Sequence, residues 1–176
     1  MFDTYFWLQN NLHKRDISTD KEYQRKFAGY YRMRFVSQKY RNSFFELFET
    51  AESQTAPSFR TISETLFCVD GKHEFSFITK MLHTIDSHRP IYDSQVDAAL
   101  RIHRKYQRDF EKKIRQDEEI LNRLSVLYQE LGALPYMAGP LAAIDQILPD
   151  QWMSTEKKLD FILWALGGLP SEIQRW

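Results

Sequence analysis

Apolar side chains recur every three or four residues along most of this chain, and no useful stretch alternates apolar and polar residues as a strand does. This spacing places apolar residues on one face of successive helices, so it restricts the chain to an all-α fold. At 176 residues the chain can bury a sizeable core, and we expect one compact multi-helix domain, residues 1–176. Its cleft is expected between two helical halves, residues 1–55 with 133–176 and residues 56–132.

Capping residues mark the expected helix boundaries. The Thr19–Glu22 spacing forms a capping box, which predicts a helix that starts after Thr19. Ser37 and Asp93 are expected to cap later helices, because their side-chain oxygens can accept the unpaired N–H groups of a first turn. The helix after Asp93 is expected to be long and charged, broken at most once, and to continue as far as residue 131. Its apolar stripe is Ile102, Tyr106, Phe110, Ile114, Leu121, Leu124, Tyr128 and Leu131.

The formal net charge is zero, but the charges are unevenly distributed. Residues 14–42 carry nine Lys or Arg against three acids, and residues 101–116 carry seven against two. Residues 117–176 carry four against nine. Two basic blocks can steer a polyanion to one face, whereas two solvated helix faces are the commoner outcome of such blocks. Charge alone leaves both interpretations open.

Cys68 is the single cysteine, which excludes an internal disulfide framework and a cysteine-rich metal site. Its apolar neighbours lead us to expect a buried, inert thiol. The histidine spacings fit no metal-ligand pattern, so we expect no metal and no cofactor. No apolar run has the length of a membrane span, and the N-terminus lacks the pattern of a signal peptide. These features predict a cytoplasmic protein that has no membrane partner.

The segment 77–96 holds the candidate catalytic residues. Lys80 lies in an apolar helical stretch, where lost hydration disfavours the charged form of an amine and favours its use as a nucleophile. Asp93 follows a turn that contains Pro90, and a helix N-terminus favours an ionised carboxylate. Such a carboxylate can stabilise a sugar oxocarbenium ion. If the two helices fold back on each other, Lys80 and Asp93 meet in one cleft; the alternative is an ion pair in which Asp93 is only a cap.

This order of residues resembles the active-site stretch of the helix-hairpin-helix DNA glycosylase superfamily, which contains the oxoguanine glycosylases. The matching residues are Lys80, in Thr79-Lys80, and Asp93, in Pro90-Ile91-Tyr92-Asp93. The resemblance covers about twenty residues. It implies that Lys80 forms a Schiff base with deoxyribose and that Asp93 is essential for base release. It also implies a divergent glycosylase-like all-α fold.

The chain departs from that family in several respects, among them a short spacing between Lys80 and Asp93 and a small overall size. The glycine-rich hairpin that grips the DNA backbone in the family is absent, and the corresponding lead-in, residues 69–76, has one glycine. Lys80 lies further into its predicted helix than a residue at a helix opening would. The iron–sulfur cysteines of some members are missing, so the resemblance implies no cluster.

Residues around the pair are candidates for DNA contact. His83 shares a helical face with Lys80 and is either a phosphate contact or a core histidine. Tyr92 can wall a base pocket by stacking or belong to the core. Tyr31 and Arg32 lie in a stretch that interleaves aromatic and basic residues, and Arg104 lies on the predicted helix that Asp93 begins. The candidate set is His83, His88, Arg89, Tyr92, Ser94, Gln95, Tyr31, Arg32 and Arg104.

These observations together predict a DNA glycosylase-like enzyme that cleaves the N-glycosidic bond of a damaged or modified base. A lysine lyase activity would accompany it in a bifunctional enzyme, and base excision or anti-phage defence would be its setting. The predicted partner is DNA. The alternative is a non-catalytic helical protein that binds another protein or a nucleic acid.

Overall fold

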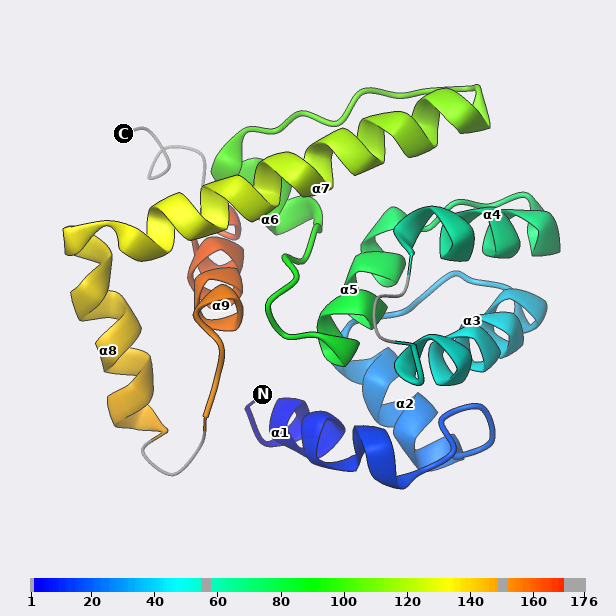
Figure 1. The fold of residues 1–176 in the computed structure, drawn as a ribbon, viewed down its shortest axis with the longest axis horizontal. Helices are drawn as coiled ribbons and strands as arrows, with labels where there is room; N and C mark the ends of the chain where they lie inside the picture. The colour runs from blue at the N-terminus through cyan, green and yellow to red at the C-terminus, as the bar shows by residue number, and fades with distance from the viewer. Residues whose placement is uncertain (1, 55–57, 149–151, 170–176) are drawn as a thin grey trace. The chain divides into compact units, whose positions relative to one another are not determined.

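The computed structural model of the protein describes residues 2–54, 58–148 and 152–169. Every regular element in these residues is a helix, so the all-α fold predicted from the apolar spacing is confirmed. The chain divides into two compact units, Met1–Asp86 and Ser87–Trp176 (Figure 1). The expectation that the chain acts as a single domain stays a prediction.

The first unit is built around a cluster of aromatic rings. Its helices are α1 (Phe2–Asn11), η1 (Leu12–Lys14), α2 (Lys21–Tyr30), α3 (Gln38–Glu52), α4 (Phe59–Asp70) and α5 (Phe75–Ile85). The Phe27 ring of α2 is fully buried at the centre of this cluster. Its centroid lies 4.8 to 5.8 Å from four other rings, those of Tyr31, Phe44, Phe45 and Phe48. Aromatic pairs at such separations stabilise a core beyond the area that they bury.

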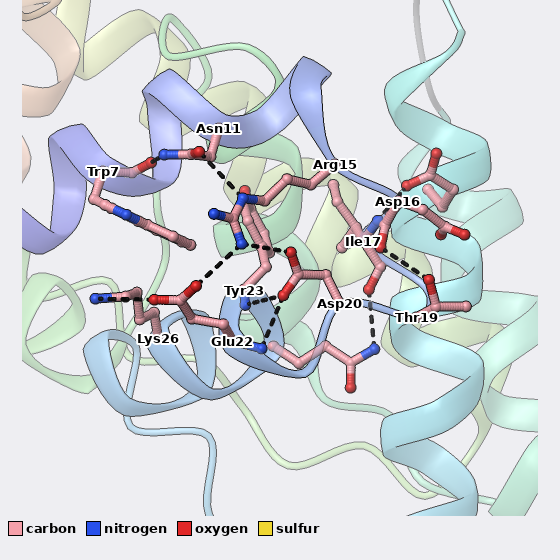
Figure 2. Close-up of polar contacts among 12 residues, drawn as sticks. Trp7, Asn11, Arg15, Asp16, Ile17, Thr19, Asp20, Glu22, Tyr23 and Lys26 are labelled. Atoms are coloured by element: carbon pink, nitrogen blue, oxygen red, sulfur yellow. Dashed lines mark hydrogen bonds and ion pairs between the residues drawn. The ribbon is translucent and has the colours of Figure 1, made fainter.

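The start of α2 differs by one residue from the predicted capping box. Asp20, not Thr19, is the N-cap, and its Oδ1 accepts hydrogen bonds from the amides of Glu22 and Tyr23 at 2.8 and 2.9 Å. Arg15 donates to the other oxygen at 2.7 Å (Figure 2). The amide of Tyr23 and the Arg15 guanidinium hold the pKa of Asp20 below its usual value. A carboxylate that can accept from two amides and a guanidinium replaces the threonine hydroxyl as the cap.

The fourth helix shows one expected and one unexpected feature. Gly71 ends α4 in a left-handed conformation with φ of 71°, as the Asp70-Gly71 pair predicts. Cys68, however, is exposed on α4, so the expectation of a buried thiol is wrong. The helical phase turns this position outward although both sequence neighbours are apolar.

The second unit consists of α6 (Ser94–Leu100), α7 (Phe110–Ala133), η2 (Pro135–Met137), α8 (Ala138–Ile147) and α9 (Thr155–Gly167). The last helix packs against the other three α-helices of this unit (Figure 1). Ser37 and Asp93 cap α3 and α6 as predicted, and Ser154 caps α9. The Ser154 hydroxyl also donates to the carbonyl of Ser87 at 2.6 Å, which ties the start of this unit to α9.

The long helix predicted after Asp93 is interrupted by a loop at residues 101–109. Arg101 ends α6 with a left-handed φ of 51°, and α7 begins only after the new cap Asp109. Tyr106, expected on the apolar stripe, is 83% exposed within this loop. The Arg104 guanidinium reaches back to the buried carboxylate of Asp117 on α7, and this tertiary contact holds the chain out of the helix.

The ends of α6 and α9 approach so closely that only glycine fits at the contact. A Cβ atom added to Gly167 would lie 1.9 Å from the backbone carbonyl oxygen of Gln95. Because backbone atoms cannot yield as a flexible side chain can, a larger residue would force α6 and α9 apart. The packing that positions Asp93 therefore depends on Gly167.

We expect Gly167→Ala to lower the free energy of unfolding by about 2 kcal/mol or more, because the added methyl group overpacks this contact. The measurement is urea unfolding followed by far-UV circular dichroism. Gly139→Ala on α8 is the matched control, since nothing lies within 4 Å of its added Cβ. Alanine should leave stability unchanged there or raise it by up to about 1 kcal/mol. Equal stability of Gly167→Ala and wild type would contradict the close approach.

Candidate functional site

Lys80 lies on α5 in a setting of hydroxyl groups and aromatic rings. Its side chain is largely buried, with 8% of the residue exposed. The Nζ atom donates to Ser76 Oγ at 3.0 Å, one turn earlier on the same helix. It also lies 5.9 Å from the ring centre of Tyr31 and 5.8 Å from that of Phe77. Ring faces attract a cation, so two aromatic residues and one serine help to hold a lysine that has lost much of its hydration.

Thr84 connects three elements around Lys80. Its hydroxyl donates to the Lys80 carbonyl at 2.7 Å and lies 3.2 Å from the Tyr31 hydroxyl. The Thr84 carbonyl accepts from Gln9 on α1 at 3.2 Å. His83, the next residue along α5, is fully buried, and its ring centre lies 6.4 Å from that of Tyr5. Lys80, Tyr31 and Thr84, the residue that follows His83, therefore lie together within the first unit.

Asp93 is the N-cap of α6 in the second unit. Its Oδ1 atom accepts hydrogen bonds from the amides of Gln95 and Val96 at 2.9 and 3.0 Å. Val96 is fully buried, so the first turn of α6 is anchored in the core and the carboxylate is held in one orientation. The backbone amide of Gln95 is thus a hydrogen-bond donor to Asp93, whereas the neighbouring Ser94 is exposed.

A buried polar group that the sequence did not reveal lies in the core of the second unit. Lys157 Nζ donates to Asp160 Oδ2 at 2.7 Å on α9, and these two residues are 1% and 6% exposed. Neither the other oxygen of Asp160 nor the hydroxyl of buried Tyr128 has a hydrogen-bond partner. Burial raises the pKa of Tyr128 well above its usual value, and the charges of Asp160 and Asp93 raise it further. Asp93 is therefore coupled electrostatically to the core of its own unit.

The sequence signal for this group was weak. Lys157 and Asp160 are three residues apart on a helix whose Leu159 and Leu163 are buried. Residues at this spacing share a helical face, so a charged pair between two core leucines could have been identified as a buried ion pair. The only principle that supports such an identification is that charged residues are seldom fully buried unless they are paired.

The other candidates of the second unit lie in separate settings. His88 is exposed and pairs with Glu156 through Nδ1 and Oε2 at 3.0 Å, and Arg89 is half-buried beside it. Tyr92 is 9% exposed. Burial, together with the charge of Asp97, raises the pKa of Tyr92 to about 12. A buried phenol is more suited to holding the turn before Asp93 than to stacking on a base.

Arg104 and Arg32 both lie in loops, although Arg104 was expected on a helix. Arg104 forms a bidentate pair with Asp117, with Nε to Oδ1 at 2.6 Å and Nη2 to Oδ2 at 2.8 Å. The Asp117 side chain is fully buried, so Arg104 has a structural partner within its own unit. Arg32 follows α2 and is exposed, with a left-handed φ of 53°.

Lys80 belongs to the first unit and Asp93 to the second, so their proposed pairing stays a prediction. Within residues 2–54, 58–148 and 152–169, no group of three or more His, Cys, Asp or Glu side chains could hold a metal ion. No helix in this part of the chain is long and apolar enough to span a bilayer.

The chain matches no protein-family model, and comparisons with curated proteins and with solved structures find no similar chain.

We expect Arg104→Ala to lower the free energy of unfolding by about 3 kcal/mol, because it leaves the buried Asp117 carboxylate without its guanidinium partner. The matched control is Arg108→Ala, which removes an exposed arginine from the same loop and should change stability by less than about 0.5 kcal/mol. Denaturant unfolding of the full chain measures both. Equal effects of the two substitutions would show that the Arg104–Asp117 pair does not anchor the loop.

Proposed function

We propose that this protein is a DNA glycosylase-like enzyme that removes a damaged or modified base. The observation that carries the proposal is the position of Asp93 relative to the loop 101–109. Asp93 caps one end of α6, and the basic loop begins at the other end. A seven-residue helix is about 10 Å long, so a nucleic-acid backbone held by the loop lies within a few nucleotides of the carboxylate.

The chemistry assigned to Asp93 follows from its fixed orientation. A carboxylate held by two backbone amides does not need to reorganise when positive charge develops on a neighbouring sugar. It can stabilise the oxocarbenium ion that forms as the bond between C1′ and the base breaks. It can also accept a proton from the attacking nucleophile, which is water in a monofunctional enzyme.

Lys80 supplies the amine that a bifunctional reaction requires. Its bond to C1′ would form as the departing base takes the electrons of the broken bond. Opening of the sugar ring, in which the C1′–O4′ bond breaks and O4′ takes a proton, would then give the Schiff base. The burial of Lys80 supports this role because lost hydration disfavours the charged form of an amine. The resemblance of residues 77–96 to the glycosylase superfamily supports it independently.

A nucleic-acid-binding protein without chemistry is the second candidate. The observation that favours it is that Asp93 Oδ1 already accepts two amide hydrogen bonds, as in an ordinary N-cap. In that case the basic loop 101–109 would still bind nucleic acid, and neither Lys80 nor Asp93 would matter beyond folding.

Borohydride trapping on oligonucleotides that carry abasic sites or modified bases tests the lysine. We expect wild type to form a covalent adduct and Lys80→Arg to form none, because arginine keeps the charge but cannot form a Schiff base. Lys72→Arg, at an exposed position before α5, is the matched control and should trap as wild type does. An adduct retained in Lys80→Arg would assign the reacting amine elsewhere.

Abasic-site formation tests the carboxylate. Asp93→Asn should slow base release by about 100-fold or more, with little change in melting temperature, because asparagine is also a good N-cap. Asp93→Ala should slow it equally and cost about 1 kcal/mol of stability as well. If wild type binds these oligonucleotides but yields neither adduct nor abasic sites, the glycosylase proposal is wrong and the non-catalytic binder replaces it.

A further inference from the structure

Two loops contain all the left-handed non-glycine residues in the described part of the chain. Arg32 and Phe35 have φ of 53° and 62°, and Arg101 and His103 have φ of 51° and 57°. The first pair lies in the loop 32–37 and the second in the loop 101–109. This backbone region is uncommon for residues other than glycine, and bulky side chains in it indicate strain that often accompanies a functional surface.

The loop 32–37 presents an aromatic ring among basic side chains. Phe35 is 94% exposed, and Arg32 and Arg34 on the same loop are exposed as well. Met33 anchors the loop, because its side chain is 3% exposed and its amide donates to the carbonyl of Ala28 at 2.8 Å. The buried Met33 therefore fixes the loop from which the Phe35 ring extends into solvent.

The loop 101–109 has the same organisation in the second unit. Tyr106 is 83% exposed, and Lys105 and Arg108 are exposed on either side of it. The bidentate Arg104–Asp117 pair and a 2.9 Å hydrogen bond from Gln116 to the Lys105 carbonyl hold the loop against α7. Supports on the residues just before Tyr106 preorganise its position, which reduces the entropy lost on binding.

Both loops are rich in basic residues, and their one acidic residue is Asp109, the N-cap of α7. Residues 32–41 carry four Lys or Arg, residues 101–108 also carry four, and neither stretch contains Asp or Glu. A partner that complements them is therefore a polyanion that also offers flat apolar faces. Unpaired nucleotides have both properties, since every base has a π-face and every linkage a phosphate.

We propose that these loops are contact sites for unpaired nucleotides, with Phe35 and Tyr106 stacking on bases and the flanking Arg and Lys residues contacting phosphates. This inference rests on the nucleic-acid partner of the proposed function, but it does not depend on the glycosylase chemistry. It assigns a preference for single-stranded or locally opened nucleic acid. In a continuous duplex the base faces are covered by their neighbours, so the two rings gain little there.

Fluorescence anisotropy with a labelled single strand and with its blunt duplex tests the inference on the full chain. Phe35→Ala and Tyr106→Ala should each weaken single-strand binding on the order of tenfold and leave the slope of affinity against salt unchanged. Arg34→Ala should instead reduce that slope by about one. The matched control is Tyr136→Ala, since Tyr136 is 69% exposed but lies in η2, outside both loops, and it should bind as wild type does.

Three outcomes would overturn the inference in different ways. Loop variants that bind the strand as wild type does, with unchanged melting temperatures, would remove the stacking role and leave the proposed function intact. A wild-type protein that binds neither strand nor duplex would remove the nucleic-acid partner altogether. Sedimentation with phosphatidylserine vesicles, lost in Phe35→Ala, together with no binding to the strand would assign the loops to an anionic membrane instead.

Discussion

The contact between Gly167 and the carbonyl of Gln95 is the constraint on which the second unit depends. The short helix α6 has seven residues, too few to be stable by itself. It persists because α9 packs closely along it, and that packing is possible only where one helix presents no side chain at all. The orientation of Asp93, two residues before Gln95, therefore depends on a glycine that lies far away in sequence.

The described part of the second unit also contains ion pairs whose charges are largely removed from water. Lys157 pairs with Asp160 beneath the surface of α9, and Arg104 covers the fully buried Asp117 of α7. Such pairs seldom stabilise a fold more than apolar residues of the same volume would, because desolvation offsets much of their attraction. These ion pairs instead favour one arrangement of the chain over others. The Arg104–Asp117 pair, for example, forms only when the loop 101–109, which contains Tyr106, lies against α7.

The local features of the fold could be predicted from sequence, because caps and apolar spacing act over a few residues. Asp93, Ser37 and the Asp70-Gly71 stop illustrate this. One break in the long helix was allowed for, but its place at residues 101–109 could not be predicted, since the charged residues there are good helix formers on average. A contact across thirteen residues, from Arg104 to Asp117, overrides that local preference. The exposure of Cys68 similarly depends on helix phase, which flanking residues alone do not define.

The candidate site likewise has local features that the sequence predicts and tertiary features that it does not. The cap geometry of Asp93 and the helical, buried position of Lys80 follow from residues within one turn. Only tertiary packing, by contrast, brings Tyr128 within electrostatic reach of Asp93 and of Asp160, the partner of Lys157. Contact between Lys80 and Asp93 would likewise depend on tertiary packing, which the twelve intervening residues, 81–92, do not specify.

The left-handed conformation of Phe35 has a consequence for how this chain would change under selection. Glycine would relax the backbone there, and a ring that is 94% exposed contributes almost nothing to the core. Selection for thermal resistance alone would therefore replace Phe35, whereas selection for the proposed base stacking would retain it. With the proposed stacking role, stability and ligand binding would oppose each other at this position, and sequence variation in the loop would show which of the two is under selection.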